Sequence, residues 1–198
     1  MKKYLAEFLG TFTLSLLVAL SLIHTIPLIT PVLAALVLVL FVYSIGNISG
    51  CHINPAVTIG LFFIKKISRK EATNYLAAQF IGGIAALLVS GLIIGNPISL
   101  GNMANSSLVV FFGELMGMFL FAFGIASVVY GKVESSMSGV VVGGSLLMGI
   151  LCAVMVGSNG VLNPAVAIGI QSFNFIYLFA PIIGSVLGMK AYEYLDTK

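Results

Sequence analysis

Six long apolar stretches and two short ones follow one another along the chain, separated by small polar breaks. The long stretches lie at about 4–26, 31–48, 72–95, 108–131, 138–157 and 174–194. Each is long enough for a helix that crosses the hydrocarbon core of a bilayer. The breaks near Pro27, at Gly95-Asn96-Pro97 and at 132–136 are rich in residues typical of turns. The short stretches, near 54–64 and 163–172, cannot span a bilayer, so the pattern predicts six membrane helices and two half-helices.

Both short stretches begin with the same four residues, Asn54-Pro55-Ala56-Val57 and Asn163-Pro164-Ala165-Val166. Asparagine is a preferred N-cap, and proline is favoured at the first position of a helix. Each tetrapeptide therefore predicts a helix start. Short apolar segments at corresponding positions of two halves are typical of a binding or conduction site near the middle of the bilayer.

The composition of the chain is that of a membrane protein, most of which lies in the bilayer. The chain is 60% hydrophobic and only 8% charged, whereas about a quarter of the residues of a soluble domain are charged. Its 198 residues suffice for six spans with tight loops, so we expect one domain over residues 1–198. The basic start and the apolar run behind it resemble a signal peptide but lack a convincing cleavage site, which favours a retained first helix. No feature indicates nucleic-acid binding.

The basic residues predict the orientation. All of them fall on one side of a six-span arrangement, while the loops at 27–30, 96–107 and 158–162 carry none. By the positive-inside rule both termini are cytoplasmic, and we expect an integral protein of the plasma (cytoplasmic) membrane. The nine basic residues are Lys2, Lys3, Lys65, Lys66, Arg69, Lys70, Lys132, Lys190 and Lys198.

The two halves of the chain repeat. Glu7 and Glu114 lie in matching Glu-x-x-Gly segments, and Asn54 and Asn163 start the two short stretches. The first repeat covers about 1–95 and the second about 107–198. Because each repeat has three spans, the two have opposite orientations in the membrane. The half-helices then enter from opposite faces, and their asparagines meet in the middle.

The predicted meeting point has a chemistry that suits neutral solutes. Irregular backbone at membrane depth is tolerated only where it is buried or lines a wet cavity, so the loops before the half-helices should face a pore with their carbonyl acceptors. The amides of Asn54 and Asn163 add donors. Two facing helix N-termini, each with about +0.5 elementary charge, disfavour protons and cations. The residues expected to line the path with their backbone are Gly50, Cys51, His52, Ile53, Asn159, Val161 and Leu162.

These motifs resemble the aquaporin, or major intrinsic protein, family over nearly the whole chain. The resemblance implies an all-α, right-handed bundle of six helices plus two half-helices in an inverted repeat. It further implies a passive channel for water and small neutral solutes of glycerol, ammonia or peroxide size, normally a homotetramer without a cofactor, with Asn54, Pro55, Ala56, Asn163, Pro164 and Ala165 at the pore centre. The segments that carry it are 6–11, 49–58, 78–82, 113–117 and 160–165.

One position departs from the family pattern. Most members have an arginine directly after the second Asn-Pro-Ala, at the outer constriction, and this chain has Val166. An ungapped comparison places the rest of that constriction at Ala34, Leu151 and Gly160, which makes it small and apolar. The resemblance also implies that Glu7 and Glu114 hydrogen-bond the loop backbone. For Glu7 the alternative is an interfacial charge that reaches toward the headgroups.

Other functions remain open at this point. A coupled secondary transporter also uses inverted repeats and broken helices, but it would need an acidic residue beside the asparagines, and the sequence places none there. A non-conducting structural member of the fold is a further alternative. An enzyme is not expected because the sequence shows no nucleophile–base pair, and Cys51, Cys152, His24 and His52 are too scattered to suggest a metal site.

Overall fold

The computed structural model describes residues 1–23, 29–95 and 106–196, and six long helices make up most of this part of the chain. All six are long and apolar enough to cross a membrane, which confirms the predicted spans to within a few residues. The turns predicted at Pro27 and at Asn96-Pro97, and also Lys198, lie outside the described residues. The long helices are α1 (Lys2–Ile23), α2 (Ile29–Ser49), α4 (Arg69–Ile94), α5 (Leu108–Val129), α6 (Ser138–Val156) and α8 (Phe175–Asp196).

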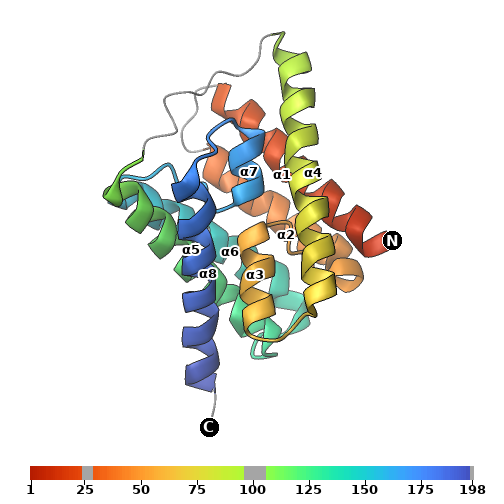
Figure 1. Cartoon of the computed structure of the whole chain (residues 1–198). Helices are drawn as coiled ribbons and strands as arrows, with labels where there is room; N and C mark the ends of the chain where they lie inside the picture. The colour runs from red at the N-terminus through yellow and green to blue at the C-terminus, as the bar shows by residue number, and fades with distance from the viewer. Residues whose placement is uncertain (24–28, 96–105, 197–198) are drawn as a thin grey trace.

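Two short helices, α3 (Pro55–Phe63) and α7 (Pro164–Gly169), begin at the two predicted prolines. A single 3₁₀ turn, η1 (Ser135–Met137), precedes α6. In Figure 1, α3 and α7 lie near the middle of the bundle, and α3 runs down toward the turn that leads into α4. That turn ends α3 because Lys65 has a positive φ of 60° and the Lys66 N–H bonds to the carbonyl of Leu61, a closure common at helix C-termini.

Each half-helix packs against a long helix of the other repeat. The first, α3, packs on α8, and the second, α7, packs on α4 and also contacts α1. The long helices pair mainly within repeats, α1 with α4 and α2, and α5 with α8 and α6, while α2 and α6 join the repeats. Because each half-helix packs on the other repeat, these contacts hold the two repeats together around the middle of the bundle.

Glycines allow these close approaches. A Cβ at Gly83 of α4 would overlap the carbonyl oxygen of Ala165 in α7. Likewise, a Cβ at Gly184 or Gly188 of α8 would overlap backbone carbonyls of α5. Helices in a bilayer gain little from burying apolar groups against one another, so association depends on such close van der Waals packing of small residues.

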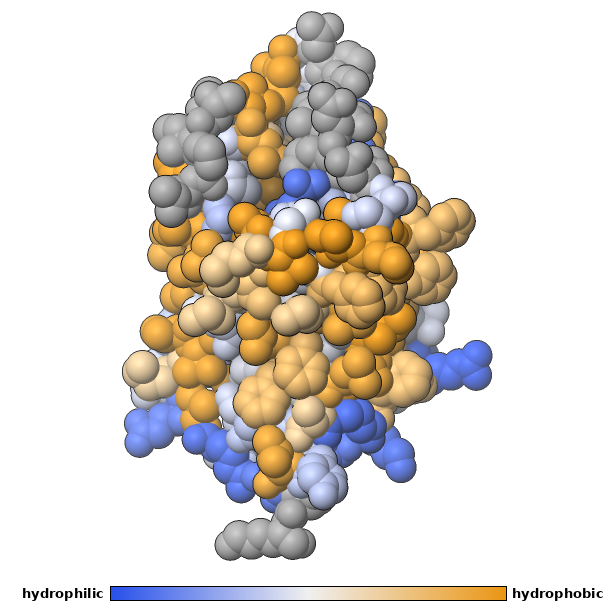
Figure 2. Space-filling view, turned by 90° about the vertical axis from the view of Figure 1, so that its left-hand side faces the viewer, coloured by the Kyte–Doolittle hydropathy of each residue, from blue (hydrophilic) through white to orange (hydrophobic). Residues whose placement is uncertain are grey.

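The outside of the bundle is apolar, and its charges gather at one end. Figure 2 shows hydrophobic residues over most of the visible face and strongly hydrophilic ones near the lower end, where the C-terminus lies in Figure 1. Contacts tie the basic segments together there: Lys3 pairs with Glu71, and Lys132 lies 2.8 Å from Asp196. The hydrogen bond with Asp196 raises the pKa of Lys132.

Replacing Gly83 with alanine should destabilise the protein because the added methyl group has no space against α7. Overpacking of this kind costs about 1–3 kcal/mol. The thermal unfolding midpoint of the purified protein in detergent measures the effect. Gly91→Ala is the matched control on the same helix, where an added Cβ meets no atom within 4 Å. Equal midpoints for the two variants would contradict this account of the α4–α7 contact.

Candidate functional site

Asn54 and Asn163 join the two half-helices by a reciprocal pair of hydrogen bonds. The Asn54 Nδ2 donates to the Leu162 carbonyl over 3.0 Å, and the Asn163 Nδ2 donates to the Ile53 carbonyl, also over 3.0 Å. Each asparagine side chain thus reaches across to the loop that precedes the other half-helix. The amide oxygens cap their own helices, Asn54 Oδ1 accepting from Ala56 N at 2.8 Å and Asn163 Oδ1 from Ala165 N at 3.0 Å.

This arrangement leaves each asparagine one donor to spare. A side-chain amide carries two N–H groups, and in each case one of them is bound to the opposite loop. Both asparagines line the larger cavity described below. The second N–H of each amide can therefore be offered to a molecule in that cavity.

The backbone of the two loops before the half-helices is strained, and Ile53 and Leu162 are strained at equivalent positions of the two repeats. Cys51, Ile53 and Leu162 have φ values of 50°, 39° and 52°, in the left-handed region that non-glycine residues seldom adopt. Such conformations cost on the order of 1–3 kcal/mol each and persist where their surroundings hold them. In this protein the surroundings include two buried carboxylates.

Glu7 of α1 holds the first loop. Its Oε1 accepts from the Ser49 hydroxyl at 2.6 Å and the His52 N–H at 3.0 Å. Its Oε2 accepts from the Ile53 N–H at 2.7 Å and from the Gln79 side chain at 2.7 Å. The carboxylate is fully buried, so it is not an interfacial charge.

Glu114 of α5 holds the second loop in the same way. Its Oε1 accepts from the Ser158 hydroxyl at 2.5 Å and the Val161 N–H at 2.9 Å, and its Oε2 from the Leu162 N–H at 2.7 Å. Ser158, Val161 and Leu162 occupy the positions in the second repeat that Ser49, His52 and Ile53 occupy in the first. The two carboxylates thus fix the same backbone segment twice, once in each repeat.

A further chain of polar side chains links Glu7 to the histidine of the first loop. Gln79 of α4 donates to Glu7 and also to Thr58 Oγ1, the latter over 2.8 Å. Thr58 Oγ1 lies 3.1 Å from His52 Nδ1. The imidazole also packs edge-on against Tyr75, with ring centroids 4.8 Å apart. These contacts fix the His52 ring at membrane depth.

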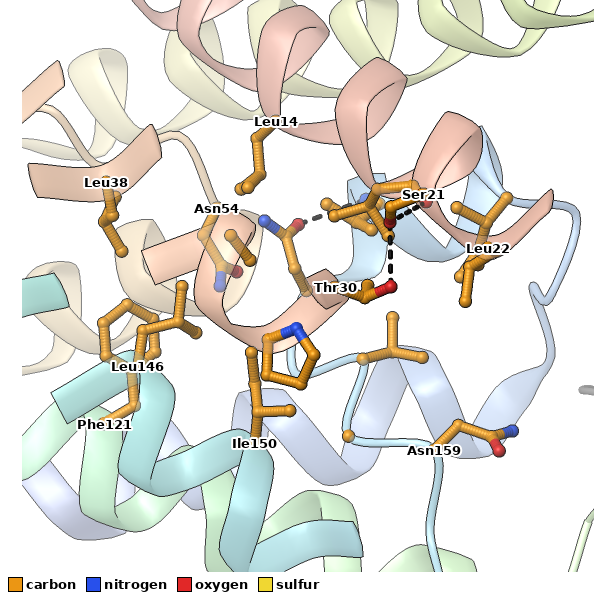
Figure 3. Close-up of a pocket in the computed structure, with 18 of the residues that line it drawn as sticks. Leu14, Ser21, Leu22, Thr30, Leu38, Asn54, Phe121, Leu146, Ile150 and Asn159 are labelled. Atoms are coloured by element: carbon orange, nitrogen blue, oxygen red, sulfur yellow. Dashed lines mark hydrogen bonds between the residues drawn. The ribbon is translucent and has the colours of Figure 1, made fainter. Parts of the chain in front are cut away.

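The larger of two cavities, about 370 Å³ in volume, lies on the α7 side of the asparagines. Figure 3 shows side chains of α1, α2, α5 and α6 pointing into it, with Asn159 from the second loop at one end. The hydroxyls of Ser21 and Thr30 bond to one another there over 2.8 Å. The predicted site residues in its wall are Ala34, His52, Ile53, Asn54, Asn159, Gly160, Val161, Asn163 and Val166.

The smaller cavity, about 230 Å³, lies toward the basic end. Predicted residues Gly50, Cys51 and His52 line it, and so does Lys66. Lys66 places its ammonium 3.9 Å from the centroid of the Tyr130 ring. Within the described part of the chain, Lys66 alone among charged residues lines either cavity. The larger cavity thus has no charged side chain in its described wall.

Several predicted residues shape the site without lining a cavity. Pro55, Ala56, Pro164 and Ala165 are buried in the half-helices, where they pack and start the helices. Leu162 is also fully buried, and its contribution is the carbonyl that accepts from Asn54.

Leu151 is the one predicted constriction residue that the structure places elsewhere. Its side chain is 38% exposed on the outside of the bundle and lines neither cavity, whereas Ile150 is 7% exposed and lines the larger one. Neighbouring residues of a helix point about 100° apart, so an error of one position in an ungapped comparison turns the side chain away. Ile150 replaces Leu151 in the cavity wall.

Sequence reasoning also missed apolar residues of the long helices that line the cavities. Leu38 and Phe121 line both of them. On α6, Val142, Leu146, Ile150 and Val154 line one cavity or the other. Their spacing of four residues is the signal that could have found the α6 set, since residues four apart share a helix face.

No group of three or more histidine, cysteine or acidic side chains close enough to hold a metal occurs among residues 1–23, 29–95 and 106–196. His24 lies outside these ranges.

Comparisons with known proteins identify relatives over most of the chain. Residues 1–192 match the family described as Major intrinsic protein. The chain is 32% identical to aquaporin AqpM of Methanothermobacter marburgensis, covering 79% of this chain and 72% of the relative. It is 31% identical to the glycerol uptake facilitator protein-like 6 of Lactiplantibacillus plantarum, covering 94% of each.

A solved structure has the same fold. The X-ray structure of the aquaglyceroporin from Plasmodium falciparum superposes with a TM-score of 0.77 at 25% identity, covering 97% of this chain and 95% of that one. This match confirms the fold class predicted from the sequence.

Removing the Glu7 carboxylate should destabilise the protein strongly. Glu7→Ala leaves the Ser49, His52, Ile53 and Gln79 donors without their acceptor, and each orphaned buried donor costs about 1–3 kcal/mol. Glu7→Gln keeps the size of the side chain and one acceptor oxygen, so its unfolding midpoint in detergent should fall less. The control is Glu134→Ala, since Glu134 is exposed and makes no capping hydrogen bond. Equal losses for the alanine and glutamine variants would show that Glu7 does not hold the loop.

Proposed function

This chain belongs to the major intrinsic protein family of membrane channels, and from this we propose that it conducts water and small neutral solutes passively, with a wide apolar constriction at its outer end. The observation that carries the proposal is the pair of asparagine amides at the meeting point of α3 and α7. Each offers one N–H to the larger cavity while its other N–H is bound to the opposite loop.

The electrostatics of the path favour neutral molecules. Both half-helices begin at the asparagines, so their positive dipole ends point at the same place. A cation or proton there meets like charge without an acidic side chain to offset it, because Glu7 and Glu114 are turned into the loop backbone. A water or alcohol oxygen, in contrast, accepts from the amides and donates to the loop carbonyls.

The names of the relatives support a solute range beyond water. They include an aquaporin and a glycerol uptake facilitator, and the solved structure is an aquaglyceroporin. In this chain the wall of the larger cavity includes Ala34, Gly160, Val166 and Ile150. None of these carries a charge or a side-chain hydrogen-bonding group, and two are very small. We propose that these small side chains leave an opening wide enough for solutes of glycerol, ammonia or peroxide size.

The membrane setting completes the proposal. We propose that the protein lies in the plasma membrane with both termini in the cytoplasm, and the positive-inside rule supports this because the basic residues gather at one end of the bundle (Figure 2). The apolar side chains exposed on the long helices face lipid or neighbouring copies. As in the family pattern, we propose a homotetramer with one path per subunit and no cofactor.

Stopped-flow light scattering on proteoliposomes tests the function. We expect water, glycerol and ammonia to pass at once, without an ion gradient, and with a weak dependence on temperature. A matched preparation of empty liposomes gives the background. Permeability equal to that background would indicate a non-conducting member of the fold, and uptake that needs an ion gradient would indicate a coupled transporter.

Restoring a charged side chain at the outer constriction should narrow it. Val166 is 4% exposed and lines the larger cavity, so Val166→Arg would add a long side chain with five donors to that wall. We expect glycerol permeability to fall more than water permeability. The ratio of the two, measured in the same proteoliposomes, is the readout. An unchanged ratio would mean that Val166 does not line the constriction.

A further inference from the structure

The outer constriction residues do not divide the path. Ala34, Gly160 and Val166 lie in the wall of one continuous cavity of about 370 Å³. That cavity extends beyond them to Ser21 and Leu22 at one end and to Leu38 and Phe121 at the other. Figure 3 shows Leu38 and Phe121 together at the end opposite Ser21 and Leu22. A molecule in this cavity can therefore move past the position of the missing arginine without leaving the cavity.

The division of the path comes deeper, between the two cavities. Three side chains are common to both walls: Leu38 of α2, His52 of the first loop and Phe121 of α5. Leu38 and Phe121 are each 2% exposed and His52 is 6% exposed. The asparagines line only the larger cavity, so the division lies on the basic side of them.

Two of these three residues set a size limit, and the third supplies polarity. Leu38 and Phe121 offer only hydrocarbon and the edge or face of an aromatic ring. His52 is held by Thr58 at Nδ1 and by the Tyr75 ring, so it cannot easily move aside. Its Nε2 remains as the nitrogen that a passing molecule can use. A neutral imidazole nitrogen suits a hydroxyl or amine group, while the apolar residues suit a carbon skeleton.

We infer that the ring of Leu38, His52 and Phe121, and not the outer set around Val166, is the size filter of this channel. The inference rests on the proposed function, because a filter requires a conducting path. It assigns selectivity to apolar residues from α2 and α5, which belong to different repeats. The outer constriction then acts as a wide entrance, and solutes are sorted after they have passed the asparagines.

Widening the ring should admit larger solutes. Phe121→Ala removes the aromatic ring, and we expect glycerol and xylitol permeability relative to water to rise by roughly tenfold, the scale on which apolar groups in a pocket discriminate. Phe112→Ala is the matched control, since Phe112 lies on the same helix, is 52% exposed and lines neither cavity. Val166→Ala widens the outer set instead, and its effect on the ratio should be smaller.

Narrowing the ring gives a second, independent arm. Leu38→Phe should lower glycerol permeability more than water permeability, whereas Leu36→Phe, at a position on the same helix that is 58% exposed, should leave both unchanged. This arm decides the question even if Phe121→Ala fails to insert or fold.

The outcomes separate this inference from the function on which it rests. If the wild-type protein conducts neither water nor glycerol, the proposed function and the filter both fail. If it conducts, but Phe121→Ala and Leu38→Phe leave the solute-to-water ratios unchanged, only the filter is overturned. A larger change from Val166→Ala than from Phe121→Ala would likewise return the filter to the outer constriction.

Discussion

Asn54 and Asn163 hold the two half-helices together by two hydrogen bonds to the opposite loops. Each donates over 3.0 Å to the carbonyl that directly precedes the other asparagine. Neither half-helix can shift along the bundle axis without breaking both bonds, so α3 and α7 stay end to end. The same bonds, which make the joint between the half-helices, leave one donor on each amide, and under the proposed function this donor binds a neutral oxygen.

The remaining features hold this joint in place at membrane depth. Strained loop residues are kept by the Glu7 and Glu114 carboxylates, which accept the loop N–H groups in both repeats. Gly83 of α4 lets the second half-helix approach closely. Neither carboxylate lines either cavity, and both accept from loop N–H groups and neighbouring side chains. A charged group thus supports the joint without giving the path an acidic side chain.

The sequence predicted most of this because the determining signals are local. An apolar stretch of about twenty residues specifies a span, and Asn-Pro specifies a helix start. The two Glu-x-x-Gly segments pointed to the carboxylates through the family resemblance. The cavity walls were harder to predict, because Leu38 and Phe121 are ordinary apolar residues whose meeting depends on how α2 and α5 tilt. The prediction that Leu151 lines the outer constriction was wrong by one residue, because an ungapped comparison does not fix the rotation of a helix about its axis.

Solute flux and proton flux measured in the same vesicles test whether the meeting point of the half-helices passes neutral molecules and excludes protons. Proteoliposomes that contain a pH-sensitive dye are given an osmotic step in one experiment and a membrane potential in another. We expect fast water and glycerol movement, with proton entry no greater than in empty liposomes, because two helix N-termini and two amide donors meet at the asparagines. A proton flux that rises in proportion to the amount of protein would contradict it.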